Sequence, residues 1–357
     1  RNYLWILWGI GLATHFLFFG HPNQIVFDEV HYGKFVSGYY THEYYFDVHP
    51  PLGKLMIAGF GKIFGFSARG GSASGGSFAN IGDKFPDSKY MALRFLPSLA
   101  GSLIPVVIFL LALQLGFSHR TSFTAGLLLA LEISLIVQTR FILIDGFLIL
   151  FGFLSLLFYL KKKPIPAGIF AGLAASTKWT GLSFLAIILI MEAISLWKKK
   201  NLRQIAPVVF KFAVLPFLVY FVVFAVHFSL LTKPGSGDAY MSQGFREKNI
   251  AAKFLELNWQ MYDSNQRLTA EHPYSSKWYS WPFMARPIFY WVDGDTRIYF
   301  LGNPIVWWAS TAGMLIGIIL LLWRRADKTI AILTGAYLLN LLPFVQRIQS
   351  ACLTDEN

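Results

Sequence analysis

The chain has 357 residues, of which 55% are hydrophobic and only 14% are charged, whereas soluble domains are about one quarter charged. Its net charge is +12, but the basic residues fall in short clusters between apolar runs. That pattern is typical of membrane topology and not of a nucleic-acid-binding face. We therefore expect an all-α polytopic membrane protein that forms one domain, residues 1–357, with no nucleic-acid partner.

Several apolar runs have about the 20 residues that a helix needs to cross the hydrocarbon core of a bilayer. The sequence predicts about nine transmembrane helices. They cover residues 3–19, 91–115, 122–137, 141–160, 165–178, 180–197, 206–229, 303–323 and 328–345.

The orientation of these spans follows from three basic clusters, at residues 161–163, 198–203 and 324–328. With nine spans, all three clusters lie on the same side of the membrane as the N-terminus. By the positive-inside rule, that side is the cytoplasm. Two long segments, residues 20–90 and 230–302, then form extracytoplasmic loops.

Both outer segments contain stretches of helical character. Residues 50–66 (PPLGKLMIAGFGKIFGF) predict a short interfacial or re-entrant helix that begins with prolines. Residues 68–88 are rich in Gly and Ser and predict a flexible connection. Residues 243–262 predict an amphipathic helix that lies on the membrane surface.

Two adjacent carboxylates, Asp28 and Glu29, follow the first apolar run in the stretch VFDEVHYGKF. Taken alone, they fit a solvated loop. The same outer segment adds Asp47 and His49 in YYFDVHPPLGK, close to the membrane. A carboxylate held under apolar walls suits a general base, because burial moves its pKa toward the working range.

Basic residues are predicted at the same outer face. Arg94 begins the second span, Arg140 lies between the third and fourth, and Lys178 lies between the fifth and sixth. Each has an ordinary structural alternative, since Arg140 could pair with Asp145 and Lys178 could reach along its helix to the interface. Together, cations that face a carboxylate pair indicate a site for an anionic lipid head group.

Eight stretches of the chain are motifs whose order along the sequence is informative. They read FDEVHYGKF, YYFDVHPPLGK, RFLPSLAGSL, QTRFILIDGFLILF, ASTKWTGLSF, HFSLLTKPGSGDAYMS, HPYSSKWYSWP and YFLGNPIVWW. In this order they cover nearly the whole chain and closely resemble the polyprenyl-phosphate-mannose-dependent protein O-mannosyltransferases, glycosyltransferase family 39.

This resemblance implies a GT-C glycosyltransferase bundle with an extracytoplasmic active site. The expected reaction is inverting transfer of mannose from a polyprenyl- or dolichyl-phosphate-mannose donor to Ser or Thr hydroxyls of secreted or membrane proteins, with the Sec translocon as an expected source of these acceptors. Asp28 matches the acidic-motif aspartate of the family and is expected to be the general base. Glu29 would orient the loop or the acceptor.

The other expected site residues contact the donor. Arg94, Arg140 and Lys178 match basic motif positions and would hold the carrier phosphate, whose charge grows as it leaves. His49 and His272 are candidate contacts to phosphate or sugar. The sequence has no metal-ligand cluster. We expect no metal and no cofactor, because a lipid-phosphate leaving group does not need the metal that a nucleotide diphosphate often uses.

The chain departs from the family pattern in two places. Eukaryotic members carry a β-trefoil MIR module in the second outer loop, and residues 230–302 leave no room for one. This favours a prokaryotic plasma-membrane enzyme, with the endoplasmic reticulum membrane expected if the source is eukaryotic. After LLPFVQRIQ the family continues into further helices, whereas this chain ends in SACLTDEN, so we expect C-terminal spans to be missing.

Other function classes remain open at this point. A GT-C transferase with a lipid or glycan acceptor would share the acidic loop. A transporter would place charges in mid-membrane and would show an inverted repeat, neither of which the sequence displays. A catalytically inactive partner subunit is also conceivable, although the retained Asp28–Glu29 pair argues against it.

Overall fold

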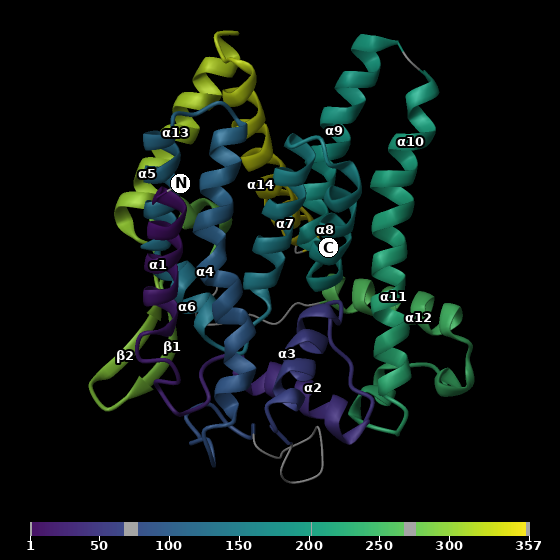
Figure 1. Cartoon of the computed structure of the whole chain (residues 1–357). Helices are drawn as coiled ribbons and strands as arrows, with labels where there is room; N and C mark the ends of the chain where they lie inside the picture. Colours follow the sequence, from purple (N-terminus) through teal and green to yellow (C-terminus); the bar gives the residue numbers. More distant parts are fainter. Residues whose placement is uncertain (1, 68–77, 201, 268–275, 355–357) are drawn as a thin grey trace.

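The structure is a computed structural model that describes residues 2–67, 78–200, 202–267 and 276–354. It is a bundle of helices with a two-stranded hairpin at one end (Figure 1). The bundle comprises α1 (Asn2–Phe16), α4 (Tyr90–Gln114), α5 (His119–Ala130), α6 (Ile133–Arg140), α7 (Asp145–Leu160), α8 (Pro164–Thr177), α9 (Leu182–Lys199), α10 (Ile205–Val209), α11 (Leu215–Leu230), α13 (Pro304–Leu322) and α14 (Lys328–Thr354). The long helix α4 is central, since it contacts α1, α3, α5, α6 and α7.

Helices occupy all the predicted spans, but not all are long enough to cross a bilayer. Within the described residues, four helices have the necessary length and composition: α4, residues 179–198, residues 205–230 and α13. The bent pair of α5 and α6 could add a fifth, while α7, α8 and residues 328–341 are shorter apolar helices. The chain is therefore an integral membrane protein by its helices, and the prediction of nine spans is not confirmed.

The predicted span 122–137 is broken into α5 and α6, which are bent by 55° relative to each other. Glu132 lies at the break. Its buried carboxylate accepts hydrogen bonds from the main chain of Ser134 at 3.2 Å, the main chain of Asn303 at 3.1 Å and the Trp307 indole at 3.0 Å. An unbroken apolar helix would have left this charge without these donors, so the break satisfies Glu132 and ties α6 to the start of α13.

The two long outer segments meet at one end of the bundle, the lower end in Figure 1. That end holds α2 (Glu29–Thr41), α3 (Leu52–Ile63), α12 (Ile250–Gln266) and the antiparallel hairpin of β1 (Ile288–Asp293) and β2 (Thr296–Phe300). The connections from α9 to α10 and from α13 to α14 lie at the opposite end (Figure 1). Main-chain hydrogen bonds join the segments, for example from Tyr44 to the Lys233 carbonyl at 3.0 Å.

The part of the Gly/Ser-rich segment that the structure describes, residues 78–88, is packed against the bundle. Main-chain hydrogen bonds join Ile25 to Asp83 at 2.9 Å and Phe85 to Asn23 at 3.0 Å. The Phe78 ring is buried against Gly33, where a Cβ atom would lie only 2.1 Å from it. The prediction of a flexible connection is wrong for these residues, and residues 68–77 lie outside the described part of the chain.

The predicted amphipathic helix begins at Ile250 and has two apolar faces instead of one. Its inner face consists of Phe254, Leu257 and Met261, which are buried in the core. Leu255 and Trp259 lie on the other face and are 68% and 65% exposed. Exposed leucine and tryptophan side chains next to apolar helices are typical of a membrane interface, so the surface position remains a prediction.

Candidate active site

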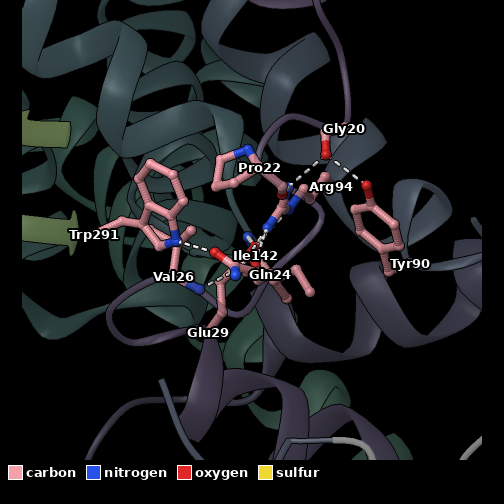
Figure 2. A network of polar contacts seen from close by, with 9 residues as sticks. All are labelled: Gly20, Pro22, Gln24, Val26, Glu29, Tyr90, Arg94, Ile142 and Trp291. Atoms are coloured by element: carbon pink, nitrogen blue, oxygen red, sulfur yellow. Dashed lines mark hydrogen bonds and ion pairs between the residues drawn. The ribbon is translucent and has the colours of Figure 1, made fainter. Parts of the chain in front are cut away.

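Glu29 is the first residue of α2, and its side chain is fully buried. One carboxylate oxygen accepts hydrogen bonds from Arg94 Nε at 2.7 Å and from the main chain of Ile142 at 2.8 Å. The other accepts from Arg94 Nη2 at 2.7 Å and from the main chain of Val26 at 2.9 Å (Figure 2). A carboxylate has about four lone-pair sites, so Glu29 has no acceptor site left for a substrate proton.

Arg94 is the partner that holds Glu29, and it is 1% exposed. Besides the two bonds to Glu29, its guanidinium donates to the carbonyls of Pro22 at 2.7 Å, Gln24 at 2.8 Å and Gly20 at 3.4 Å (Figure 2). A guanidinium has five N–H donors, and all five are engaged. The predicted contact of Arg94 with the donor phosphate does not fit this arrangement. Arg94 instead fixes the loop that leads to Asp28.

Asp28 differs from its neighbour in every one of these respects. It precedes α2, its side chain is only partly buried, and no hydrogen bond to its carboxylate is found among the described residues. Burial raises its pKa, and the charges of Asp145 and Asp47 act in the same direction, while His31 and Lys178 oppose them. A free carboxylate with a raised pKa can accept a proton.

Lys178 brings a positive charge to the same place from the end of α8. Its ammonium donates a 2.8 Å hydrogen bond to Asp145, and both side chains are about 20% exposed. Asp145 also accepts from the Gln138 side-chain amide at 2.7 Å. The alternative pairing of Asp145 with Arg140 is thus wrong. An ammonium has three N–H donors, so Lys178 can bind an anion while it stays paired.

Asp47 and His49, between α2 and α3, form a second polar group with Lys54 of α3. Lys54 is buried, is paired with Asp47, and donates to the His49 carbonyl at 2.7 Å. Burial, aided by the charge of Lys178, lowers the pKa of His49 to about 4. His49 is therefore neutral near pH 7 and can both donate and accept a hydrogen bond. All three residues line a small pocket.

Two further predicted residues do not join this group. Arg140 donates to the carbonyls of Thr14, Leu17 and Phe18 at 2.7–3.1 Å, which caps the C-terminal end of α1. None of its described contacts reaches Asp28 or Lys178. His272 lies outside the described residues, so its predicted contact with the donor stays a prediction.

Three residues that were not proposed for the site also lie in it: Gln138, Lys54 and Tyr290. Gln138 and Lys54 are part of the motifs QTRFILID and HPPLGK, so the motifs could have indicated them. Tyr290 lies on β1 and donates a hydrogen bond to Gln138. The hairpin was not predicted, although Gly294-Asp295 between the β-prone runs 288–293 and 296–300 is a two-residue hairpin signal that could have indicated the strand of Tyr290.

The charged residues of this region are of two kinds, which differ in whether the protein itself uses all their hydrogen-bonding groups. Glu29 and Arg94 are buried and have all their hydrogen bonds filled by protein groups. Asp28 and Lys178 are partly exposed and keep free capacity on an acceptor and on a donor, respectively. Such a pair can take a proton from a hydroxyl and bind an anionic group nearby.

We predict that Glu29→Gln destabilises the protein by about 3–5 kcal/mol, because breaking a buried ion pair leaves Arg94 uncompensated. Arg94→Lys should also be destabilised, because an ammonium cannot reproduce the five planar bonds. Thermal unfolding in detergent measures both. The matched control is Asp263→Asn, which breaks the exposed pair with Arg267 and should cost about 0–1 kcal/mol. A Glu29→Gln protein as stable as this control would contradict the anchoring role.

Comparisons with known proteins place this geometry in context. The fold matches a solved Saccharomyces cerevisiae protein O-mannosyltransferase, the Pmt1-Pmt2 complex bound to the sugar donor. The TM-score is 0.86 over 95% of this chain and 80% of that one, at 19% identity. An Archaeoglobus fulgidus oligosaccharyltransferase, AglB, matches less closely, with a TM-score of 0.52 over 95% of this chain and 47% of that one, at 16% identity. At these identities the matches show a GT-C-like fold.

Curated relatives are more similar in sequence but much longer. Dolichyl-phosphate-mannose–protein mannosyltransferase 4 of Candida albicans is 31% identical over 67% of this chain and 34% of its own length. Protein O-mannosyltransferase 1 of Drosophila melanogaster is 30% identical over 68% of this chain and 29% of its own length. The chain thus spans about one third of the length of the curated relatives it matches.

Family models cover nearly the whole chain. A model described as the C-terminal four-TMM region of protein O-mannosyltransferase matches residues 250–347. The model of dolichyl-phosphate-mannose–protein mannosyltransferase matches residues 5–232, which include Asp28, Glu29 and Lys178. The chain therefore belongs to the dolichyl-phosphate-mannose–protein mannosyltransferase family.

Proposed function

We propose that the protein transfers mannose, with inversion at the anomeric carbon, from a polyprenyl- or dolichyl-phosphate-mannose donor to Ser or Thr hydroxyls of proteins. The observation that carries this proposal is the difference between the two adjacent acids. Glu29 is buried and fully hydrogen-bonded, whereas the Asp28 carboxylate is partly exposed, has no hydrogen bond within the described residues, and is affected by the charge of Lys178. Membership of the family supplies the substrate class.

In the proposed reaction, Asp28 takes the proton of the acceptor hydroxyl as its oxygen attacks the anomeric carbon. The new C–O bond forms on the face opposite the phosphate. The bond from the anomeric carbon to the phosphate oxygen breaks, and its electron pair leaves with the lipid phosphate. Lys178 would stabilise that growing negative charge, and neutral His49 is a candidate hydrogen-bond partner for sugar or phosphate.

We also propose that the reaction needs no metal and no cofactor. In this scheme the leaving group is a lipid monophosphate, and the cation that stabilises it is a protein ammonium. Full activity in the presence of EDTA would support the proposal, and loss of activity that added Mg²⁺ or Mn²⁺ restores would refute it.

The site is proposed to face the extracytoplasmic side of a plasma membrane of prokaryotic type, or the lumen if the source is eukaryotic. Basic clusters lie at the connections opposite the end that holds α2, α3 and α12 (Figure 1), and the positive-inside rule makes that opposite end cytoplasmic. Acceptor proteins that emerge from the Sec translocon would then reach Asp28 from the aqueous side while the lipid carrier stays in the bilayer.

Two other functions compete with this proposal. A transferase with a lipid or glycan acceptor would use the same Asp28 and Lys178 but would not modify a Ser/Thr peptide. A transporter-like protein would transfer no mannose at all. Incubating the protein in membranes with polyprenyl-phosphate-mannose and a Ser/Thr peptide separates all three when peptide mannosylation and donor consumption are both measured. Only the proposed function yields a mannosylated peptide, and only the transporter consumes no donor.

The orientation can be tested with an impermeant thiol reagent on intact cells, in a Cys352→Ser background. We predict that Gln266→Cys, at the end of α12, is labelled. Lys163→Cys, between α7 and α8, should be labelled only after the cells are opened. Both positions are exposed, so a difference reports sidedness. Labelling of position 163 alone in intact cells would reverse the proposed topology.

We predict that Asp28→Asn keeps the shape of the site but loses about 10²–10⁴-fold in transfer rate, the usual range for a positioned general base. Its donor binding should remain close to that of the unmodified protein, whereas Lys178→Gln should weaken donor binding. Peptide mannosylation and donor titration on purified, folded variants measure the two effects. Near-normal turnover by Asp28→Asn would remove Asp28 as the base and leave Asp47 as the next candidate.

A further inference from the structure

The residue before Asp28 has an unusual backbone conformation. Phe27 has φ +46°, in the left-handed region that a bulky residue rarely adopts. Such a conformation persists only where the surrounding structure over-determines it. Glu29 fixes the backbone on the N-terminal side of Phe27, because its carboxylate accepts a hydrogen bond from the main chain of Val26. The question is what holds the Phe27 side chain.

The β1–β2 hairpin supplies that contact through Tyr290, which is buried. The Tyr290 ring stacks on the Phe27 ring, with centroids 4.2 Å apart and planes 13° from parallel. The next residue, Trp291, donates from its indole to the Gln24 side chain at 2.5 Å (Figure 2). The hairpin therefore contacts the loop before Asp28 at two separate points.

Tyr290 is also connected to the cation of the site. Its hydroxyl donates to the Gln138 side-chain oxygen, the Gln138 amide donates to Asp145 at 2.7 Å, and Asp145 accepts from Lys178 at 2.8 Å. Burial raises the pKa of Tyr290, so its hydroxyl stays protonated and remains a donor. One side chain thus touches both the strained residue beside the proposed base and the chain of contacts that orients the proposed phosphate ligand.

We propose that Tyr290 is a positioning residue with two separable roles: its ring fixes Asp28 through Phe27, and its hydroxyl fixes Lys178 through Gln138 and Asp145. This inference deepens the proposed mannosyl transfer and rests on it. It also explains how the region matched by the C-terminal family model, which includes the hairpin, contributes to a site whose charged residues all come from the first 178 residues.

The two roles predict different kinetic effects: loss of the hydroxyl should act on the donor KM, and loss of the ring should act on kcat. Tyr290→Phe keeps the ring but loses one hydrogen bond, so the KM for the donor should rise about 3- to 10-fold while kcat stays within about 2-fold. Gln138→Leu, which breaks the same connection, should raise the donor KM in the same way. Tyr290→Leu loses the stacked ring as well and should lower kcat by about 10- to 100-fold, since small misplacements of catalytic groups cost this much.

Tyr299 provides the matched control on the same hairpin. It lies on β2, is 36% exposed, and packs on Phe289 with ring centroids 4.5 Å apart and planes tilted by 42°. Its described ring contact does not involve Phe27. Tyr299→Phe and Tyr299→Leu should leave both kinetic constants within about 2-fold of the unmodified protein. If Tyr290→Leu behaved like Tyr299→Leu, or if Tyr290→Phe lost kcat as severely as Tyr290→Leu, the division of roles would be overturned.

Hydrogen exchange gives a readout that does not depend on activity. In membranes or nanodiscs, the peptide covering residues 20–32 should exchange faster in Tyr290→Leu than in Tyr290→Phe or Tyr299→Leu. If the unmodified protein transfers no mannose, the proposed function fails, yet the exchange experiment still tests the contact. If it transfers mannose but exchange and kinetics are the same in Tyr290→Leu and Tyr299→Leu, the function stands and the role of Tyr290 is refuted.

Discussion

The site depends on one buried ion pair, Glu29 with Arg94. Burying two charges is costly unless each has its remaining hydrogen-bonding capacity filled, and here four acceptor sites and five donors are all used. The pair ties the start of α2 to α4 and to the main chain at Ile142. Because Glu29 cannot move without breaking these bonds, the position of Asp28, one residue earlier in the chain, is fixed as well.

The other charged residues around Asp28 also fall into two groups. Some have their hydrogen-bonding groups occupied by protein partners, and others keep a donor or acceptor available for a ligand. Lys54 is neutralised by Asp47, and Arg140 is used on the carbonyls at the end of α1. Lys178 is partly exposed and its charge acts on Asp28, and its partner Asp145 holds it through a single oxygen. In the proposed reaction, Asp28 would act as the base and Lys178 as the cation for the phosphate of a lipid-linked donor.

Sequence motifs predicted the bundle, the acidic loop and the cation at Lys178, because each depends on local composition or on a contiguous pattern. They could not show which of the two adjacent acids is free. That depends on partners 65 and 113 residues away, Arg94 and Ile142. The break between α5 and α6 was missed for the same reason, since Glu132 is satisfied by residues 171 and 175 positions later. The hairpin was missed although Gly294-Asp295, between two β-prone runs, is a local hairpin signal. Its contact with Phe27, by contrast, depends on the tertiary fold.

The pH dependence of mannosyl transfer tests most directly whether Asp28 is the base. Asp28 must be ionised to accept a proton, so the rate should rise with pH through its pKa. Because burial raises that pKa, the rise should lie above the value of about 4 expected for an exposed aspartate. The account predicts that Asp28→Asn loses this acid limb together with most of its activity. A limb that persists unchanged in Asp28→Asn, or that is absent from the unmodified protein above pH 4, would contradict it.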